Sequence, residues 1–120
     1  MKKTLLLALA LIAVGCAEPI PRNLDELVLT VVDDVYVWLD RETMSPYSGP
    51  VFRFFPGDTT QVEFIGRLKD GKRGGAWETY TRQGLLITSG TYRDGESCGE
   101  WFVGANALSG SGGTVTYPPC

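Results

Sequence analysis

The chain has 120 residues, of which 43% are hydrophobic and 21% charged, and its formal net charge is −3; this length accommodates one small domain. It contains no histidine, which excludes a Ser-His-Asp triad, a Cys-His dyad and a His-ligated zinc site, so we expect no enzyme, no metal and no other cofactor. The acidic balance argues against nucleic acid as a partner, because phosphate binding needs clustered Lys and Arg.

Residues 1–15 are predicted to be a signal peptide. Lys2 and Lys3 supply a basic start, and residues 4–14 (TLLLALALIAV) form an apolar run too short to span a bilayer as a permanent helix. Residues 13–16 (AVGC) resemble the bacterial lipobox, and this resemblance implies that Cys16 is lipidated and becomes the new N-terminus. Ala13 stands where the lipobox usually has Leu, Val or Ile, so ordinary signal-peptidase cleavage that leaves a free Cys16 is the alternative.

The residues after Cys16 indicate where the protein is anchored. Ala17 follows the cysteine, and the lack of Asp at this position implies, by resemblance to Gram-negative lipoproteins, a lipid-anchored protein of the outer membrane. Acyl chains on Cys16 would make the membrane its first partner without any spanning helix. Loss of Lys2 and Lys3 with the signal peptide changes the formal charge from −3 to −5. Residues 16–23 contain two prolines and no apolar period, which predicts an extended tether.

Residues 24–46 are predicted to form an N-terminal β-hairpin followed by a loop. Residues 27–32 and 35–39 are rich in β-branched and aromatic side chains, and they flank Asp33 and Asp34, which suit a tight turn. The alternative is one helix from Asp25 to Glu42 with Asn23 as its N-cap, against which the density of valine argues.

Residues 47–120 contain an internal repeat with a period of 24 residues. Turn signals recur along this region, and two copies share glycine, Asp-Gly and tryptophan positions. The repeat signature comprises Gly66, Asp70, Gly71, Gly75, Trp77 and Tyr80 in one copy and Gly90, Tyr92, Asp94, Gly95, Gly99 and Trp101 in the next. Residues 48–55 form an earlier partial copy at an offset of 25, which predicts that Phe52 takes the tryptophan position.

This signature resembles the bacterial MORN-variant repeat over residues 47–103. The resemblance implies an all-β fold, an antiparallel meander of MORN-like β-hairpin repeats, and a function in binding proteins or membrane surfaces. Many bacterial members of the family carry an antitoxin label. Residues 104–113 (GANALSGSGG) belong to no repeat.

Alternation along the strand at residues 62–69 predicts a sheet with one apolar face. Val62, Phe64 and Leu68 point to that face, whereas Ile65 shares the other face with charged side chains. No amphipathic helix is present to cover the apolar face, so either the N-terminal hairpin or a partner covers it. Aromatic residues at repeat positions are expected first of all to pack neighbouring strands together.

Lipidation of Cys16 leaves two cysteines, Cys98 and Cys120, in an exported protein. If Trp101 pairs with Tyr117 in a last hairpin, the two cysteines lie opposite each other, and a disulfide between them is expected. We therefore expect a membrane-anchored envelope lipoprotein that acts as a non-catalytic protein-binding or structural module. One alternative is an antitoxin-like neutraliser of a toxic protein, and another is an envelope hydrolase.

Overall fold

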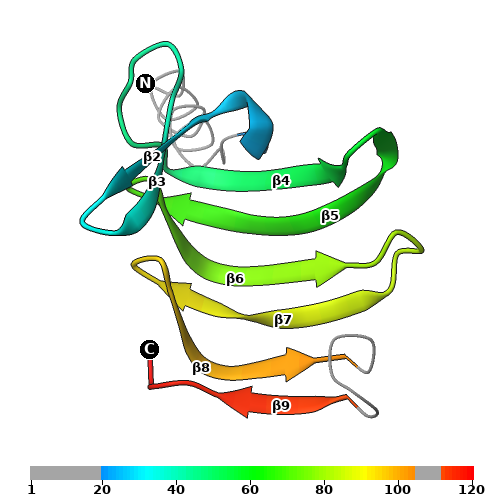
Figure 1. Cartoon of the computed structure of the whole chain (residues 1–120). Helices are drawn as coiled ribbons and strands as arrows, with labels where there is room; N and C mark the ends of the chain where they lie inside the picture. The colour runs from blue at the N-terminus through cyan, green and yellow to red at the C-terminus, as the bar shows by residue number, and fades with distance from the viewer. Residues whose placement is uncertain (1–19, 105–111) are drawn as a thin grey trace, which may run out of the picture.

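The computed structural model describes residues 20–104 and 112–120, and these residues form an all-β fold with one short 3-10 helix (Figure 1). The predicted signal peptide, Cys16 and the first part of the predicted tether lie outside the described residues. The elements are β1 (Arg22–Asn23), η1 (Leu24–Glu26), β2 (Val28–Val32), β3 (Val35–Leu39), β4 (Gly49–Phe55), β5 (Asp58–Lys69), β6 (Lys72–Tyr80), β7 (Leu86–Arg93), β8 (Glu96–Val103) and β9 (Gly113–Thr116).

Seven strands form one sheet in the order β1-β4-β5-β6-β7-β8-β9, and β2 pairs with β3 in a separate hairpin. From β4 to β9 each strand is antiparallel to its neighbour in the chain, which confirms the predicted meander; β1 joins β4 in parallel. The β2–β3 hairpin excludes the alternative helix over residues 25–42. Figure 1 shows this hairpin beside the sheet, at the side where β5 turns into β6.

Three two-residue turns join strands with both central residues at positive φ. Asp33 and Asp34 have φ values of 50° and 64°, and Asp-Gly pairs take the same place between β5 and β6 and between β7 and β8. This conformation matches the right-handed twist of the flanking strands, and aspartate tolerates it better than most residues. The predicted turns at Asp33-Asp34, Asp70-Gly71 and Asp94-Gly95 are therefore confirmed.

The repeat is explained by a tryptophan that lies over a glycine of the preceding strand. A Cβ atom at Gly66 would lie 2.2 Å from the ring of Trp77, and one at Gly90 would lie 2.0 Å from the ring of Trp101. The Trp77 indole donates a hydrogen bond to the Arg67 carbonyl oxygen at 3.0 Å, and the Trp101 indole donates to that of Thr91 at 3.2 Å. Each tryptophan is thus fixed by the glycine below it and by the carbonyl beside that glycine.

A β-bulge recurs at the same place in both copies. The register shifts between Ile65 and Arg67 where β5 meets β6, and between Ser89 and Thr91 where β7 meets β8. Opposite these shifts, Gly75 and Gly99 both have φ of 67°, a conformation that glycine adopts without steric cost. The 24-residue period therefore encodes one bulged hairpin built twice.

Val51, not Phe52, occupies the tryptophan position of the partial copy, which corrects the sequence prediction. Val51 pairs with Gly66 as Trp77 pairs with Gly90, and its side chain is only 1% exposed. Phe52 pairs with Ile65 one residue further along. The alignment fails here because register shifts between Arg53 and Phe55 take up an additional residue that the turn signals do not reveal.

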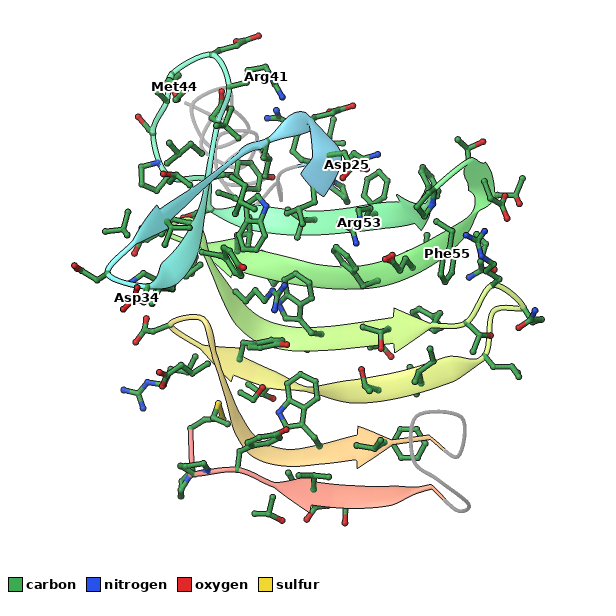
Figure 2. The ribbon with its side chains drawn as sticks, viewed as in Figure 1. Asp25, Asp34, Arg41, Met44, Arg53 and Phe55 are labelled. Atoms are coloured by element: carbon green, nitrogen blue, oxygen red, sulfur yellow. A yellow bond between two sulfur atoms is a disulfide. The ribbon has the colours of Figure 1, made fainter. Side chains whose placement is uncertain are left out.

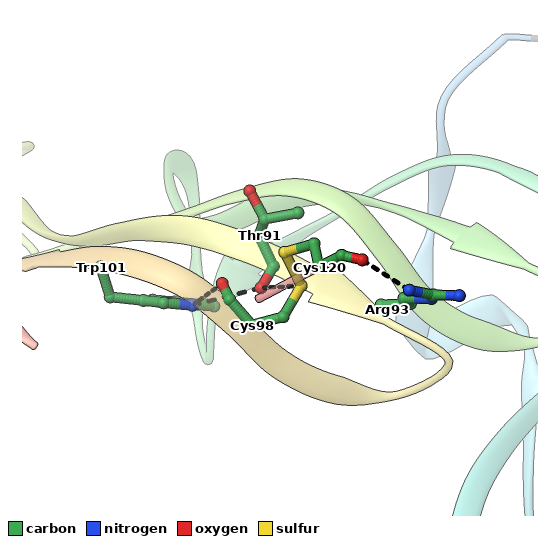
Figure 3. Close-up of a disulfide and its surroundings, with 5 residues drawn as sticks. All are labelled: Thr91, Arg93, Cys98, Trp101 and Cys120. Atoms are coloured by element: carbon green, nitrogen blue, oxygen red, sulfur yellow. Dashed lines mark hydrogen bonds between the residues drawn. A yellow bond between two sulfur atoms is a disulfide. The ribbon is translucent and has the colours of Figure 1, made fainter. Parts of the chain in front are cut away.

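The predicted disulfide between Cys98 and Cys120 is present, with the two Cα atoms 5.0 Å apart (Figure 3). The register used to predict it is wrong, because Trp101 pairs with Val115 and not with Tyr117. The Gly99 N–H donates to the Pro118 carbonyl, and the Gly99 carbonyl accepts from the Tyr117 N–H, so the chain bends there and takes up two residues before Cys120. The disulfide joins two cysteines that are 22 residues apart in the sequence. Closure of a loop of this length stabilises the fold by about 3 kcal/mol in the chain-entropy model.

The N-terminal segment packs onto part of the apolar face of the sheet, as the first of the two expected covers predicts. Leu24, Leu27 and Trp38 form one buried cluster with side chains of the sheet, namely Val51, Phe64, Leu68, Trp77 and Trp101. Phe64 and Leu68 are buried and Ile65 is exposed, as the alternation predicts. Within the described ranges, no helix has the length and apolar character needed to cross a membrane.

Candidate functional site

The hairpin is joined to the sheet by backbone hydrogen bonds at the β5–β6 turn. The Trp38 N–H donates to the Gly71 carbonyl at 2.8 Å, and the Gly71 N–H donates to the Tyr47 carbonyl at 2.8 Å. A Cβ atom at Gly71 would lie 2.6 Å from Cγ1 of Val37, so only glycine permits this approach. The signature glycine therefore closes a turn and also seats the hairpin, a second role that its place in the repeat does not reveal.

Arg73 lies at the seam between the hairpin and the sheet, among three aromatic rings. Its guanidinium carbon is 5.5 Å from the ring centroid of Trp38 and 5.4 Å from those of Trp77 and Tyr92. Each distance is within the range of a favourable cation–π contact. The sequence shows Arg73 as one more charged residue near a turn, and only the packing of the hairpin identifies it as a caged cation.

Arg73 has few polar partners. One guanidinium nitrogen, Nη1, lies 3.5 Å from the Tyr92 hydroxyl, while the Nε atom is buried and makes no hydrogen bond. Among the residues described, no carboxylate lies within 4.0 Å of this guanidinium, whereas Arg22 and Arg53 both pair with acids. A buried donor without an acceptor costs stability, and Nε of Arg53 is in the same state.

A cavity of about 180 Å³ opens beside Arg73. Its walls come from the β2–β3 turn, β3, the start of β6 and the β7–β8 turn. Figure 2 shows Asp34, one of the lining residues, at the tip of the hairpin. The lining residues are Asp34, Val35, Tyr36, Trp38, Arg73, Gly95 and Glu96. We call this space the seam cavity.

The aromatic signature residues pack against one another across the strands. Ring centroids are 5.3 Å apart for Phe64 and Trp77, 5.6 Å for Trp77 and Tyr92, and 5.0 Å for Tyr92 and Trp101. Tyr117, the residue after β9, extends the row, with its centroid 6.2 Å from that of Trp101. Trp77 and Trp101 are buried, so the signature aromatics are packing residues in the first place.

Tyr80, the remaining aromatic of the signature, lies outside this row. Burial raises the pKa of its hydroxyl, and the neighbouring carboxylate of Glu78 raises that pKa further. Tyr80 pairs with Leu86 at the C-terminal end of β6, which is the end away from the β5–β6 turn. It therefore contributes to the sheet and not to the seam cavity.

Three apolar side chains on one face of the hairpin are open to solvent. Val31 pairs with Tyr36, and Leu29 pairs with Trp38, which places all of them on the same face. Leu29 is 51% exposed, and Val31 and Tyr36 are each 58% exposed. We call Leu29, Val31 and Tyr36 the hairpin patch. The sequence analysis expected the exposed apolar surface on the sheet, and it missed this patch because it did not assign the two faces of the hairpin.

The outer face of the sheet is mixed in character. Ile65 and Phe102 are exposed there, but Glu78 and Ser89 lie between them in the row of paired residues that crosses β5 to β8. Single exposed apolar residues are ordinary on protein surfaces. The hairpin patch is therefore a better candidate contact surface than this row.

Electrostatic contacts fix the N-terminal segment against the rest of the fold. Arg22 on β1 lies 3.4 Å from the Asp40 carboxylate and 5.5 Å from the ring centroid of Tyr47. Backbone N–H groups of Glu42 and Thr43 donate to the Asp40 carboxylate, and together with Arg22 they hold the pKa of Asp40 below its ordinary value. Burial raises the pKa of the Tyr47 hydroxyl. These contacts order the end of the chain that leads to the predicted tether.

The described residues contain no group of three or more His, Cys, Asp or Glu side chains that could hold a metal ion. Cys98 is joined to Cys120, and its Sγ lies 3.6 Å from the Thr91 carbonyl oxygen, to which the Trp101 indole donates a hydrogen bond (Figure 3). The predicted lipidation residue, Cys16, lies outside the described residues. No family model, no curated protein and no solved structure matches this chain.

Proposed function

We propose that this protein is a lipoprotein of the bacterial envelope, anchored in the outer membrane through acyl chains on Cys16, and that its sheet domain is a non-catalytic protein-binding or structural module. The proposal begins with the basic, apolar N-terminus that leads to Gly15-Cys16. The MORN-variant resemblance supports a binding role, and the Cys98–Cys120 disulfide suits an exported domain.

The hairpin patch is the observation that carries the binding function. Apolar side chains that are more than half exposed and adjacent on one face of a hairpin are typical of an interaction surface. β1 begins six residues after Cys16, and a chain of that length spans at most roughly 20 Å. A lipid on Cys16 would therefore hold the N-terminal edge of the sheet close to the membrane and limit the partner to proteins near it.

In-cell photo-crosslinking tests the binding role. A photoreactive amino acid replaces Val31 or Tyr36 in the test variants. In the control it replaces Glu100, an exposed residue of β8 that is distant from the hairpin patch in the sequence. We expect the same discrete crosslinked partner from both patch positions and none from the control. Absence of a crosslink at both patch positions, or an identical product from the control, would refute the patch as a binding surface. A toxic protein as the crosslinked partner would favour the neutraliser function.

A further inference from the structure

We propose that the seam cavity binds a small free α-amino acid, with Arg73 pairing with its carboxylate and the rim carboxylates pairing with its ammonium group. This inference goes beyond the proposed protein-binding role and does not depend on membrane anchoring. It is carried by three features of the cavity, namely a cation held among aromatic rings, two exposed acids and an aromatic wall.

The carboxylate end of the ligand is recognised by Arg73. This guanidinium lines the cavity and is held in place by Trp38, Trp77 and Tyr92. Its planar fork suits bidentate pairing with a carboxylate, and in the described part of the chain no acid lies within 4.0 Å of it. Arg73 is thus a preorganised cation whose counter-ion is left for a ligand to supply.

The ammonium end is recognised at the rim. Asp34 lies in the β2–β3 turn and Glu96 is the first residue of β8; both are exposed, and both line the cavity. A simple anion would be attracted by Arg73 but repelled by these two carboxylates, and a simple cation would meet the opposite problem. A zwitterionic α-amino acid, whose ammonium and carboxylate groups are bonded to the same carbon, offers an opposite charge to all three groups.

The walls limit the size of the ligand. The cavity volume of about 180 Å³ lies below the several hundred Å³ typical of drug-sized ligand pockets. Tyr36 and Trp38 provide an aromatic wall, with ring centroids 6.1 Å apart and planes inclined at 52°. An amino acid with a small apolar side chain would place that side chain against the wall.

NMR titration of the purified full-length protein tests the proposal with three probes. L-alanine carries both charges, acetate carries only the carboxylate, and ethylammonium carries only the ammonium group. We expect alanine to shift the Arg73 Nε–H and Trp38 indole N–H resonances and to bind at least about tenfold more tightly than either single-charge probe. Equal binding of acetate or ethylammonium, or no shift with alanine, would overturn the proposal.

Charge-removing variants separate ligand recognition from folding. The double substitution Asp34→Asn with Glu96→Gln should weaken alanine binding about tenfold. Asp33→Asn is the matched control, because Asp33 lies in the same turn with φ of 50° but outside the cavity lining, and it should leave binding unchanged. Arg73→Lys keeps the charge, loses the planar fork and should weaken binding by a similar factor. If Arg73→Lys does not fold, the rim variants decide alone, and unchanged alanine affinity in the double variant contradicts the proposal.

Discussion

At the scale of single residues, the repeat depends on glycines that lie beneath tryptophan rings. Gly66→Ala would place a methyl group 2.2 Å from the Trp77 ring, which the packed sheet cannot accommodate without moving the indole from its hydrogen bond to Arg67. Such overpacking typically costs about 1–3 kcal/mol. We expect this loss in the free energy of unfolding, measured by urea denaturation with tryptophan fluorescence.

Gly74→Ala is the matched control, because Gly74 also lies in the sheet but faces its nearest atom, Cβ of Lys69, at an ordinary 3.5 Å. It should leave stability unchanged or raise it by up to about 1 kcal/mol, since alanine restricts the unfolded chain. Equal stability of the Gly66 and Gly74 variants would contradict this explanation of the repeat.

The sequence reveals which residues recur, but it reveals less about why. The period of 24 predicts Gly66 and Trp77 as signature positions, and the structure shows the contact that joins them. The same alignment places Phe52 where Val51 lies, because a bulge adds a residue without changing any turn signal. Arg73 could not be identified from the sequence, because its cage includes Trp38, a residue brought to it only by tertiary packing.

At the scale of elements, the β2–β3 hairpin is the cover of the sheet. Trp38 is 6% exposed and belongs to the core cluster, whereas Tyr36, two residues earlier on the same face of β3, is 58% exposed. Trp38→Ala should therefore lower the free energy of unfolding by about 3–5 kcal/mol. Tyr36→Ala should change it by no more than about 0.5 kcal/mol. Chemical denaturation of the two variants measures both effects, and a Trp38→Ala variant as stable as Tyr36→Ala would show that the hairpin does not cover the core.

The order of the elements could be predicted from the sequence because the signals are local. Alternating apolar residues and Asp-Gly turns predict the hairpins, and the structure confirms them. The pairing of β8 with β9 could not be predicted, since the bend at Gly99 and Pro118 shifts the register while the two cysteines still meet. The exposed side of the hairpin depends on how it packs on the sheet, which no local pattern specifies.

At the scale of the whole molecule, the described residues form a single-layer sheet, and the N-terminal segment packs over the β4–β6 end of its apolar face (Figure 2). That arrangement leaves the hairpin patch and the seam cavity at the N-terminal end of the fold, where the predicted lipid anchor would also lie. Anchoring and binding would then occur at one end of the molecule. The proposed lipid on Cys16 is central, because it would set the compartment in which any partner must be found.

Intact mass and membrane partition of the full-length protein and of Cys16→Ser, both produced in the native host, test this claim most directly. We predict a wild-type mass that corresponds to residues 16–120 plus two or three acyl chains, recovery in the outer-membrane fraction, and loss of both in the variant. An unacylated wild-type protein in the soluble fraction would contradict the account and would favour a secreted protein with a free Cys16.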